Sequence, residues 1–177
     1  MKTIYSIFIL LVVCCSCKQY KNILDKNDIT EIKLLVADSS IFGDSKWMYN
    51  QNTGLIGDKN GNMFFVDSSG KPLHSPMQQV TFKGAEKDEL IDILNTIKLN
   101  AKKSYSRTCI LLLRHSLLLF SDSWKLNSKV DICFDCAEAI FSKDKSQIDF
   151  LNQHDEYKKL IKIFKIKKIY MYNATAD

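Results

Sequence analysis

Hydrophobic and polar residues alternate in several short segments of the first half of the chain. The clearest alternation spans residues 31–37 and predicts a half-buried strand. Apolar residues at 47–49 and 63–66 flank Asn60-Gly61, a dipeptide suited to the positive φ angles of a tight hairpin turn. A further short strand is predicted at residues 78–82, so this half is expected to form a β-meander.

The apolar spacing changes to a helical period at two places in the second half. From Glu86 onward acidic residues lead and lysines trail, an order that complements the helix dipole. The apolar stripe of this first helix is Leu90, Ile91, Leu94 and Ile97. A second amphipathic helix is predicted to begin near Ser146. Its stripe is Tyr157, Leu160, Ile161 and Phe164, and Lys158, Lys162 and Lys165 lie opposite.

Two segments of strand character lie between these helices, at residues 109–120 and 129–135, and we expect them to pair as a hairpin. Residues 169–172 are predicted as a last edge strand. This order of elements predicts a single α+β domain over residues 31–177. Its antiparallel sheet would consist of the meander and the C-terminal-half hairpin, packed with the two amphipathic helices.

The N-terminal residues have the pattern of a secretory leader. Lys2 supplies a short positive region, residues 4–13 are almost all apolar, and small or thiol residues follow up to Cys17. This apolar run is too short to cross a hydrocarbon core of ~30 Å as a helix, which needs about 20 residues. The pattern therefore predicts a cleaved leader and not a transmembrane anchor.

The end of this leader resembles that of bacterial lipoproteins. In such leaders a small residue precedes a cysteine whose thiol receives diacylglycerol, and the resemblance places the lipid on Cys17. Cys14 stands where the motif prefers leucine, so Cys15 and Cys14 are alternatives, as is cleavage without lipidation. The expected organisation is a signal peptide at residues 1–16 and a lipidated tether at residues 17–30.

The composition is that of a folded protein. Of the 177 residues 46% are hydrophobic and only two are proline, which excludes a disordered chain. The formal net charge is +5, and six lysines fall between Lys158 and Lys168. A solvated helix face explains this run, and attraction to anionic lipid headgroups is an alternative. Nucleic acid is not an expected partner, because no nucleic-acid-binding module accompanies the charge, and no motif predicts a cofactor.

The predicted hairpin carries the candidate chemistry of the mature chain. Cys109, Cys133 and Cys136 are its cysteines, and Arg114 and His115 lie between them. We expect Cys109 and Cys136 to lie on the core face near the open end of the hairpin and to form a disulfide. A bond that closes so long a loop stabilises the folded state by about 2–4 kcal/mol. Cys133 would then be left over as an odd thiol.

The register of the hairpin is expected to bury its apolar residues. With Ser121 facing Ser128, Arg114 would oppose Asp135 as a cross-strand charge pair, and Ser116 would oppose Cys133. The residues on the core face would be Leu113, His115, Leu117, Leu119, Val130, Ile132 and Phe134.

Three other interpretations of the same residues stay open. Cys133 and Cys136 have the spacing of redox dithiols, but such pairs stand at helix N-termini and this pair ends a strand. The three cysteines with His115 match the ligand count of a zinc site, although the register puts Cys133 on the wrong face. A cysteine nucleophile with His115 as its base lacks a group that orients the imidazole. A core histidine is the simpler interpretation of His115.

These residues give the chain a resemblance to a group of small uncharacterised bacterial lipoproteins. The shared pattern is a cysteine at Cys109, an Arg-His pair at Arg114-His115, and an Ile-Cys-Phe-acid-Cys strand at residues 132–136. A C-terminal helix follows in both. This chain has Leu113 where the group often has proline. The resemblance implies an envelope lipoprotein and brings no activity with it.

The expected function is therefore binding and not catalysis. The chain would be held by lipid to the inner or outer membrane, on the periplasmic or cell-surface side, and would bind an envelope or toxin protein. An immunity-type lipoprotein is one subtype of this hypothesis. The alternative is a thiol-redox or zinc-binding envelope protein that uses Cys109, Cys133 and Cys136.

Overall fold

The computed structural model describes residues 24–38, 56–57, 63–100, 112–143, 146–149 and 154–171 of the chain. Its strands are β1 (Glu31–Val36), β2 (Ile56–Gly57), β3 (Met63–Phe64), β4 (Gln78–Phe82), β5 (Leu112–Leu113), β6 (His115–Phe120), β7 (Leu126–Cys133), β8 (Glu138–Phe141) and β9 (Ser146–Asp149). Its helices are α2 (Gly84–Leu99) and α3 (His154–Ile166).

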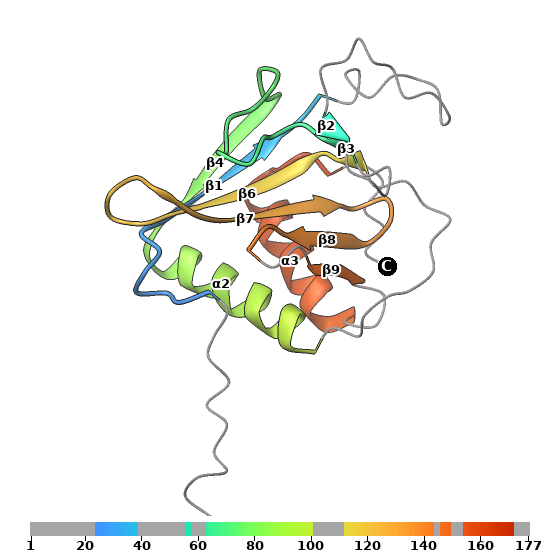
Figure 1. Cartoon of the computed structure of the whole chain (residues 1–177). Coiled ribbons are helices and arrows are strands. Elements are labelled where there is room, and N and C mark those ends of the chain that lie inside the picture. The colour runs from blue at the N-terminus through green and yellow to red at the C-terminus, as the bar shows by residue number, and fades with distance from the viewer. Residues whose placement is uncertain are drawn as a thin grey trace, which may run out of the picture.

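A six-stranded antiparallel sheet forms the centre of the fold, in the order β4-β1-β6-β7-β8-β9. Both helices lie on the same side of this sheet (Figure 1). Strands β2, β3 and β5 form a separate three-stranded sheet. Met63 of β3, with Phe65 and Val66 directly after it, packs on the face of the six-stranded sheet opposite the helices. This architecture confirms the predicted single α+β domain with an antiparallel sheet and two amphipathic helices.

The main hydrophobic core lies between the helices and the sheet. Ile32, Leu34 and Val36 of β1 point into it at alternate positions and are fully buried. Each large apolar side chain buried in this way contributes about 1.5–3 kcal/mol. The predicted stripes of both helices face this core and consist of Leu90, Ile91, Leu94, Ile97, Tyr157, Leu160, Ile161 and Phe164. The lysines predicted opposite the stripe of α3 are exposed.

A second, smaller core covers the opposite face of the sheet. Leu35 and Leu118 point away from the helices and pack against Met63, Phe65 and Val66. The segment around β3 therefore shields this face from solvent. For this reason β1 is buried on both faces, and the half-buried strand predicted from its alternation is wrong in that respect.

The first hairpin differs from its prediction in one strand. β2 and β3 pair antiparallel, with Ile56 opposite Phe64, and the segment between them contains Asn60-Gly61. β2 thus takes the place expected for residues 47–49, which lie outside the described residues. The strand predicted at residues 78–82 is confirmed as β4 and pairs with β1 at the edge of the main sheet.

Two strands near the C-terminus were not predicted. A four-residue turn follows Cys133, in which the Ala137 N–H donates to the Phe134 carbonyl at 3.1 Å and Ala137 has a φ of 51°. The chain then returns as β8 beside β7. β9 occupies the region near Ser146 where a helix was expected, and α3 begins only at His154. The predicted start of the second helix is therefore wrong.

The register of β6 and β7 is shifted by two residues from the predicted one. His115 lies opposite Ile132 and Ser116 opposite Asp131, with an irregularity between Leu119 and Phe120. A two-residue shift keeps each side chain on its face, so most of the predicted core face is correct.

Leu113 is the exception on this predicted core face. It packs with Cys133 and Ile140 on the far side of the sheet. The strand is interrupted at Arg114, whose N–H donates to the Leu112 carbonyl at 3.0 Å. This interruption separates β5 from β6 and breaks the alternation of faces.

Helix α3 ends in a Schellman motif. The Ile169 N–H donates to the Phe164 carbonyl at 2.9 Å, and Lys168 adopts the left-handed conformation with a φ of 53°. The chain then passes β4, where the Gln78 side chain bonds the Lys168 carbonyl and the Tyr170 N–H. The Gln78 side chain thus makes the hydrogen bonds that a paired strand would make with its backbone. Residues 169–171 therefore do not form the predicted edge strand.

Candidate functional site

The hairpin of β6 and β7 positions the side chains that the sequence analysis selected. Arg114 Nη1 forms an ion pair with Asp135 Oδ2, in which the Arg114 side chain is largely buried and Asp135 lies at the surface. The predicted charge pair is therefore present, although the two-residue shift makes it diagonal and not directly opposite. Arg114 directly precedes the buried His115, so the ion pair at this end of the hairpin lies next to the hydrophobic core.

His115 is a core histidine. Its side chain is 1% exposed, and its ring meets Phe134 edge to face at a centroid distance of 4.7 Å. Nε2 lies 2.8 Å from the Tyr170 carbonyl, which can only accept, so Nε2 carries the proton of this bond. Burial lowers the pKa of His115 from 6.5 to about 4. The imidazole is neutral at neutral pH and has no access to a substrate in solution.

The two described cysteines of the hairpin are in different states. Cys136 is disulfide-bonded, and Cys133 is a buried free cysteine. Burial raises the pKa of the Cys133 thiol, which disfavours the reactive thiolate. The structure does not join Cys133 to Cys136 as a dithiol pair would require. The pairing of Cys136 with Cys109 stays a prediction, because Cys109, like Cys17, lies outside the described residues.

The proposed zinc ligands are not brought together as far as the structure describes them. Within the described ranges, no group of three or more histidine, cysteine, aspartate or glutamate side chains could hold a metal ion. Cys136 is held in its disulfide, and His115 faces the helices while Cys133 faces away from them. Cys133 and Cys136 do lie in one cluster on that far side, but the disulfide occupies the Cys136 thiol and His115 is on the opposite face.

A buried ion pair that the sequence did not predict lies on the far face of the sheet. Lys129 Nζ contacts Asp131 Oδ2 at 2.9 Å, and the Ser116 hydroxyl donates to Asp131 Oδ1 at 2.5 Å. Lys129 and Asp131 are 5% and 1% exposed. Lys129 Nζ also donates to the Val66 carbonyl at 2.8 Å and lies 5.2 Å from the centroid of the Phe64 ring. The chain around β3 thus closes this network to solvent.

The electrostatics of this network follow from its burial. Desolvation raises the pKa of Asp131, and the charge of Lys129 with the Ser116 hydrogen bond opposes that rise. A lysine and a carboxylate so deeply buried are tolerated only because each satisfies the other. The network therefore joins β6, β7 and the segment after β3, and it offers no open surface for chemistry.

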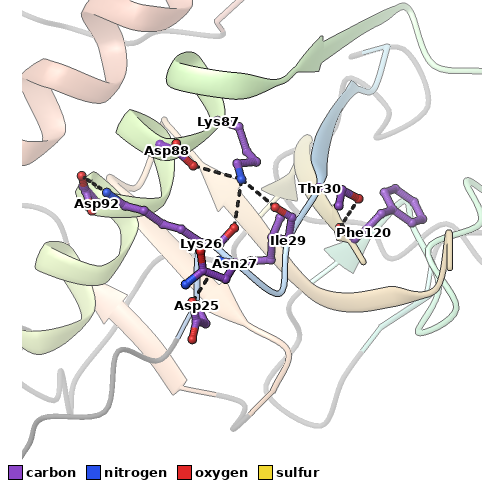
Figure 2. A network of polar contacts seen from close by, with 9 residues as sticks. All are labelled: Asp25, Lys26, Asn27, Ile29, Thr30, Lys87, Asp88, Asp92 and Phe120. Atoms are coloured by element: carbon purple, nitrogen blue, oxygen red, sulfur yellow. Dashed lines mark hydrogen bonds and ion pairs between the residues drawn. The ribbon is translucent and has the colours of Figure 1, made fainter. Parts of the chain in front are cut away.

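Residues 24–30, which the sequence assigns to the tether, pack against α2 (Figure 2). Leu24 and Ile29 are buried in the main core, in contact with the helix side of the sheet. The Leu24 N–H and carbonyl bond the two ends of the Asn95 side-chain amide at 3.0 and 2.8 Å. Residues 24–30 are thus part of the folded domain and not only of a tether.

A buried lysine holds the same segment from the other end. Lys87 Nζ donates to the carbonyls of Lys26 and Ile29 at 2.9 and 2.7 Å and pairs with Asp88 at 3.0 Å (Figure 2). Lys26 in turn pairs with Asp92 of α2 at 2.6 Å. We call these contacts of residues 24–30 with α2 the N-terminal clamp. It determines where the chain enters the domain.

Substituting Lys87 with methionine should loosen the N-terminal clamp. The change leaves two backbone carbonyls without their donor, so we expect a loss of about 1–3 kcal/mol in the free energy of unfolding. Amide hydrogen exchange in residues 24–30 should accelerate with it. Glu89→Gln, an exposed change on the same helix, is the control and should alter stability by less than about 0.5 kcal/mol. Unchanged exchange of residues 24–30 in Lys87→Met would contradict the role given to Lys87.

Comparison of the chain with models of known protein families, with curated proteins and with solved structures found no match. Among the described residues, no helix has the length and apolar character needed to cross a membrane. The resemblance to small bacterial lipoproteins stays a prediction. A function for this chain must therefore be argued from its own residues.

Proposed function

We propose that this chain is a membrane-anchored bacterial lipoprotein whose α+β domain binds a partner in the cell envelope without catalysis. The observation that carries the proposal is the leader pattern, in which a positive residue and an apolar run precede Ser16-Cys17. Cys17 is the proposed site of lipidation. The resemblance of residues 109–136 to small bacterial lipoproteins supports the same class.

The position of the N-terminal clamp is compatible with such an anchor. The first described contact of the domain is at Leu24, so residues 18–23 separate it from Cys17. A segment of this length needs no structure of its own to connect a lipid to a domain. Two or three acyl chains give a durable attachment, because each buried methylene contributes about 0.8 kcal/mol.

The state of the titratable groups supports binding over catalysis. His115, Asp131 and Cys133 are all buried, and none of the three lies on a surface that a substrate can reach. Functional acids, bases and nucleophiles need such access. The buried Cys133 thiol therefore gives little support to the redox or zinc alternative.

An exposed aromatic residue offers a contact for a protein partner. Trp124 stands at the tip of the β6–β7 hairpin with 66% of its surface exposed and a φ of 56°. Lys33 Nζ lies 5.2 Å from the Trp124 ring centroid and 5.3 Å from that of Phe120. Exposed tryptophans contribute strongly to protein interfaces. An envelope or toxin protein is the partner class we propose.

Replacing Cys17 with alanine tests the anchor. We expect most of the protein to leave the membrane fraction, because the acyl chains lose their attachment site. Intact-mass measurement of the wild-type protein should show an acylated N-terminus at Cys17. Cys14→Ala and Cys15→Ala are the matched controls and should keep both the acyl mass and the membrane fraction. Unchanged fractionation of Cys17→Ala, with no acyl mass on the wild type, would refute the proposal.

A further inference from the structure

The outer side of α3 carries four exposed lysines, which we call the lysine face. It consists of Lys158, Lys159, Lys162 and Lys165. Lys159 pairs with Glu156 at 3.7 Å, and no carboxylate among the described residues pairs with the other three. Most of the positive charge of this surface is therefore not neutralised within the described part of the domain.

An exposed apolar side chain accompanies the lysine face. Ile166 is 69% exposed and follows Lys162 by four residues, so the two side chains lie on the same side of α3. The opposite stripe of the helix is buried in the core. Lysines around an exposed isoleucine form the surface of an interfacial helix, whose charges meet headgroups and whose apolar residue enters between them.

The N-terminal clamp places the proposed anchor on the same side of the domain. Leu24 is bonded to α2, and α2 packs beside α3, where Glu86 pairs with Lys167 at 2.5 Å. Both helices lie on one side of the sheet (Figure 1). Fully extended, residues 18–23 span at most about 25 Å between Cys17 and Leu24. A lipid on Cys17 therefore keeps the helix side of the domain close to the bilayer.

The acidic residues of α2 do not cancel this charge. Glu86 and Asp92 are two of its outward carboxylates, and they are paired with Lys167 and Lys26. Glu89 is exposed on the same helix. Most carboxylates of α2 are thus ion-paired, with Glu89 as the exposed exception, and α3 is the basic half of the helix layer.

We infer that the lysine face binds an anionic phospholipid surface, with Ile166 inserted among the headgroups. The inference rests on the proposed lipid anchor, because a short tether gives the face a high local concentration of headgroups. Basic residues near an anionic leaflet are attracted to it over about 8 Å at physiological salt. The domain then lies with its helices on the membrane and its sheet side directed away, where Trp124 and the β3 segment face solvent or a protein partner.

Lysine reactivity on vesicles tests this orientation. The purified acylated protein is incorporated into vesicles of phosphatidylcholine alone or of equimolar phosphatidylcholine and phosphatidylglycerol. Each lysine is then acetylated with a water-soluble reagent, and the rates are read by peptide mass spectrometry. We expect the lysine face to react about fivefold more slowly on the anionic vesicles. Lys71, Lys125 and Lys143 are exposed elsewhere and should react equally on both.

A pair of matched variants separates specific contact from net charge. Lys158→Gln/Lys162→Gln/Lys165→Gln should lose the protection of Lys159 on anionic vesicles. Lys71→Gln/Lys125→Gln/Lys143→Gln removes the same charge and should keep that protection. Equal effects of the two triple variants would overturn the inference, since they would show attraction by total charge alone.

The outcomes distinguish the anchor from the lysine face. In one outcome the protein stays on both kinds of vesicle and the lysine face reacts equally on each. This result would support the anchor and overturn the inference. Equal protection on both vesicles also overturns it, because the face would then meet a neutral surface or a second copy of the chain. A protein without acyl mass that binds neither vesicle would overturn the anchor together with the inference.

Discussion

Lys129→Met is expected to lower the free energy of unfolding by about 3–5 kcal/mol, the cost of removing one partner of a buried ion pair. Asp131 would lose its only described cation while it stays sealed beneath the segment after β3. The Ser116 hydroxyl would be left to support the carboxylate alone. Denaturant unfolding of the wild type and the variant measures this loss.

The double variant Lys129→Met/Asp131→Asn is the informative control. It removes both charges and keeps an oxygen that can accept from Ser116, so most of the lost stability should return. Lys125→Met, an exposed change in the same hairpin, should alter stability by less than about 0.5 kcal/mol. A loss of under about 1 kcal/mol in Lys129→Met would show that the pair is not required.

The stability of Lys129→Met should also depend on pH in a characteristic way. Without Lys129 the pKa of Asp131, already raised by burial, rises further in the folded state. Between the unfolded and the folded pKa the folded chain holds a proton that the unfolded chain lacks, so stability falls as the pH rises. The deficit of Lys129→Met should therefore shrink in acid. A deficit that stays constant with pH would contradict an unpaired carboxylate as its cause.

Acidification should destabilise the wild-type domain through His115. Its pKa is lowered from 6.5 to about 4 by burial, so the unfolded chain takes up a proton in this interval and the folded chain does not. Stability is lost as the pH falls from 6.5 and the loss is complete below 4, at about 3 kcal/mol. Denaturant unfolding curves measured between pH 4 and 6.5 give the change in the free energy of unfolding with pH.

His115→Gln isolates this effect from other titrations. Glutamine keeps an N–H that can donate to the Tyr170 carbonyl, and it cannot take up the proton. The raised pKa of Asp131 acts with the opposite sign and is common to both proteins, so the difference between the two pH profiles belongs to His115. Parallel profiles would refute a neutral buried imidazole at this position.

Periodicity predicted the elements whose buried faces are long and regular. The alternation at 31–37, the segment 78–82 and the stripe that includes Leu160 and Phe164 all became the expected elements. β8 and β9 have only four residues each, too few to establish a period, and both were missed. The register of β6 and β7 was misplaced because a two-residue shift preserves the faces, so the apolar pattern cannot distinguish the alternatives.

The buried ion pair could not be recognised from the chain alone. Lys129 and Asp131 stand two residues apart in a strand, which is the pattern of a solvent-exposed face. Only the coverage by Phe64 and Val66, more than sixty positions earlier, turns that face into an interior. His115, in contrast, was correctly predicted as a core residue, because it alternates with apolar residues along its own strand, although Phe164 of α3 also contacts it. The pattern within one strand can thus predict which face of that strand is buried, but it cannot predict that a distant segment also covers the other face.

The N-terminal clamp also has a mechanical consequence. If Cys17 carries the proposed lipid, a partner that moves relative to the membrane would pull on the chain, and the load would enter the domain at Leu24. The contacts with Asn95 and Lys87 bear this force before β1 does. If they yield, residues 24–30 are released and the connection lengthens by less than about 25 Å, the fully extended length of seven residues. The clamp would thus take the load in series before the six-stranded sheet, and Leu24 and Ile29 would leave the main core when it yields.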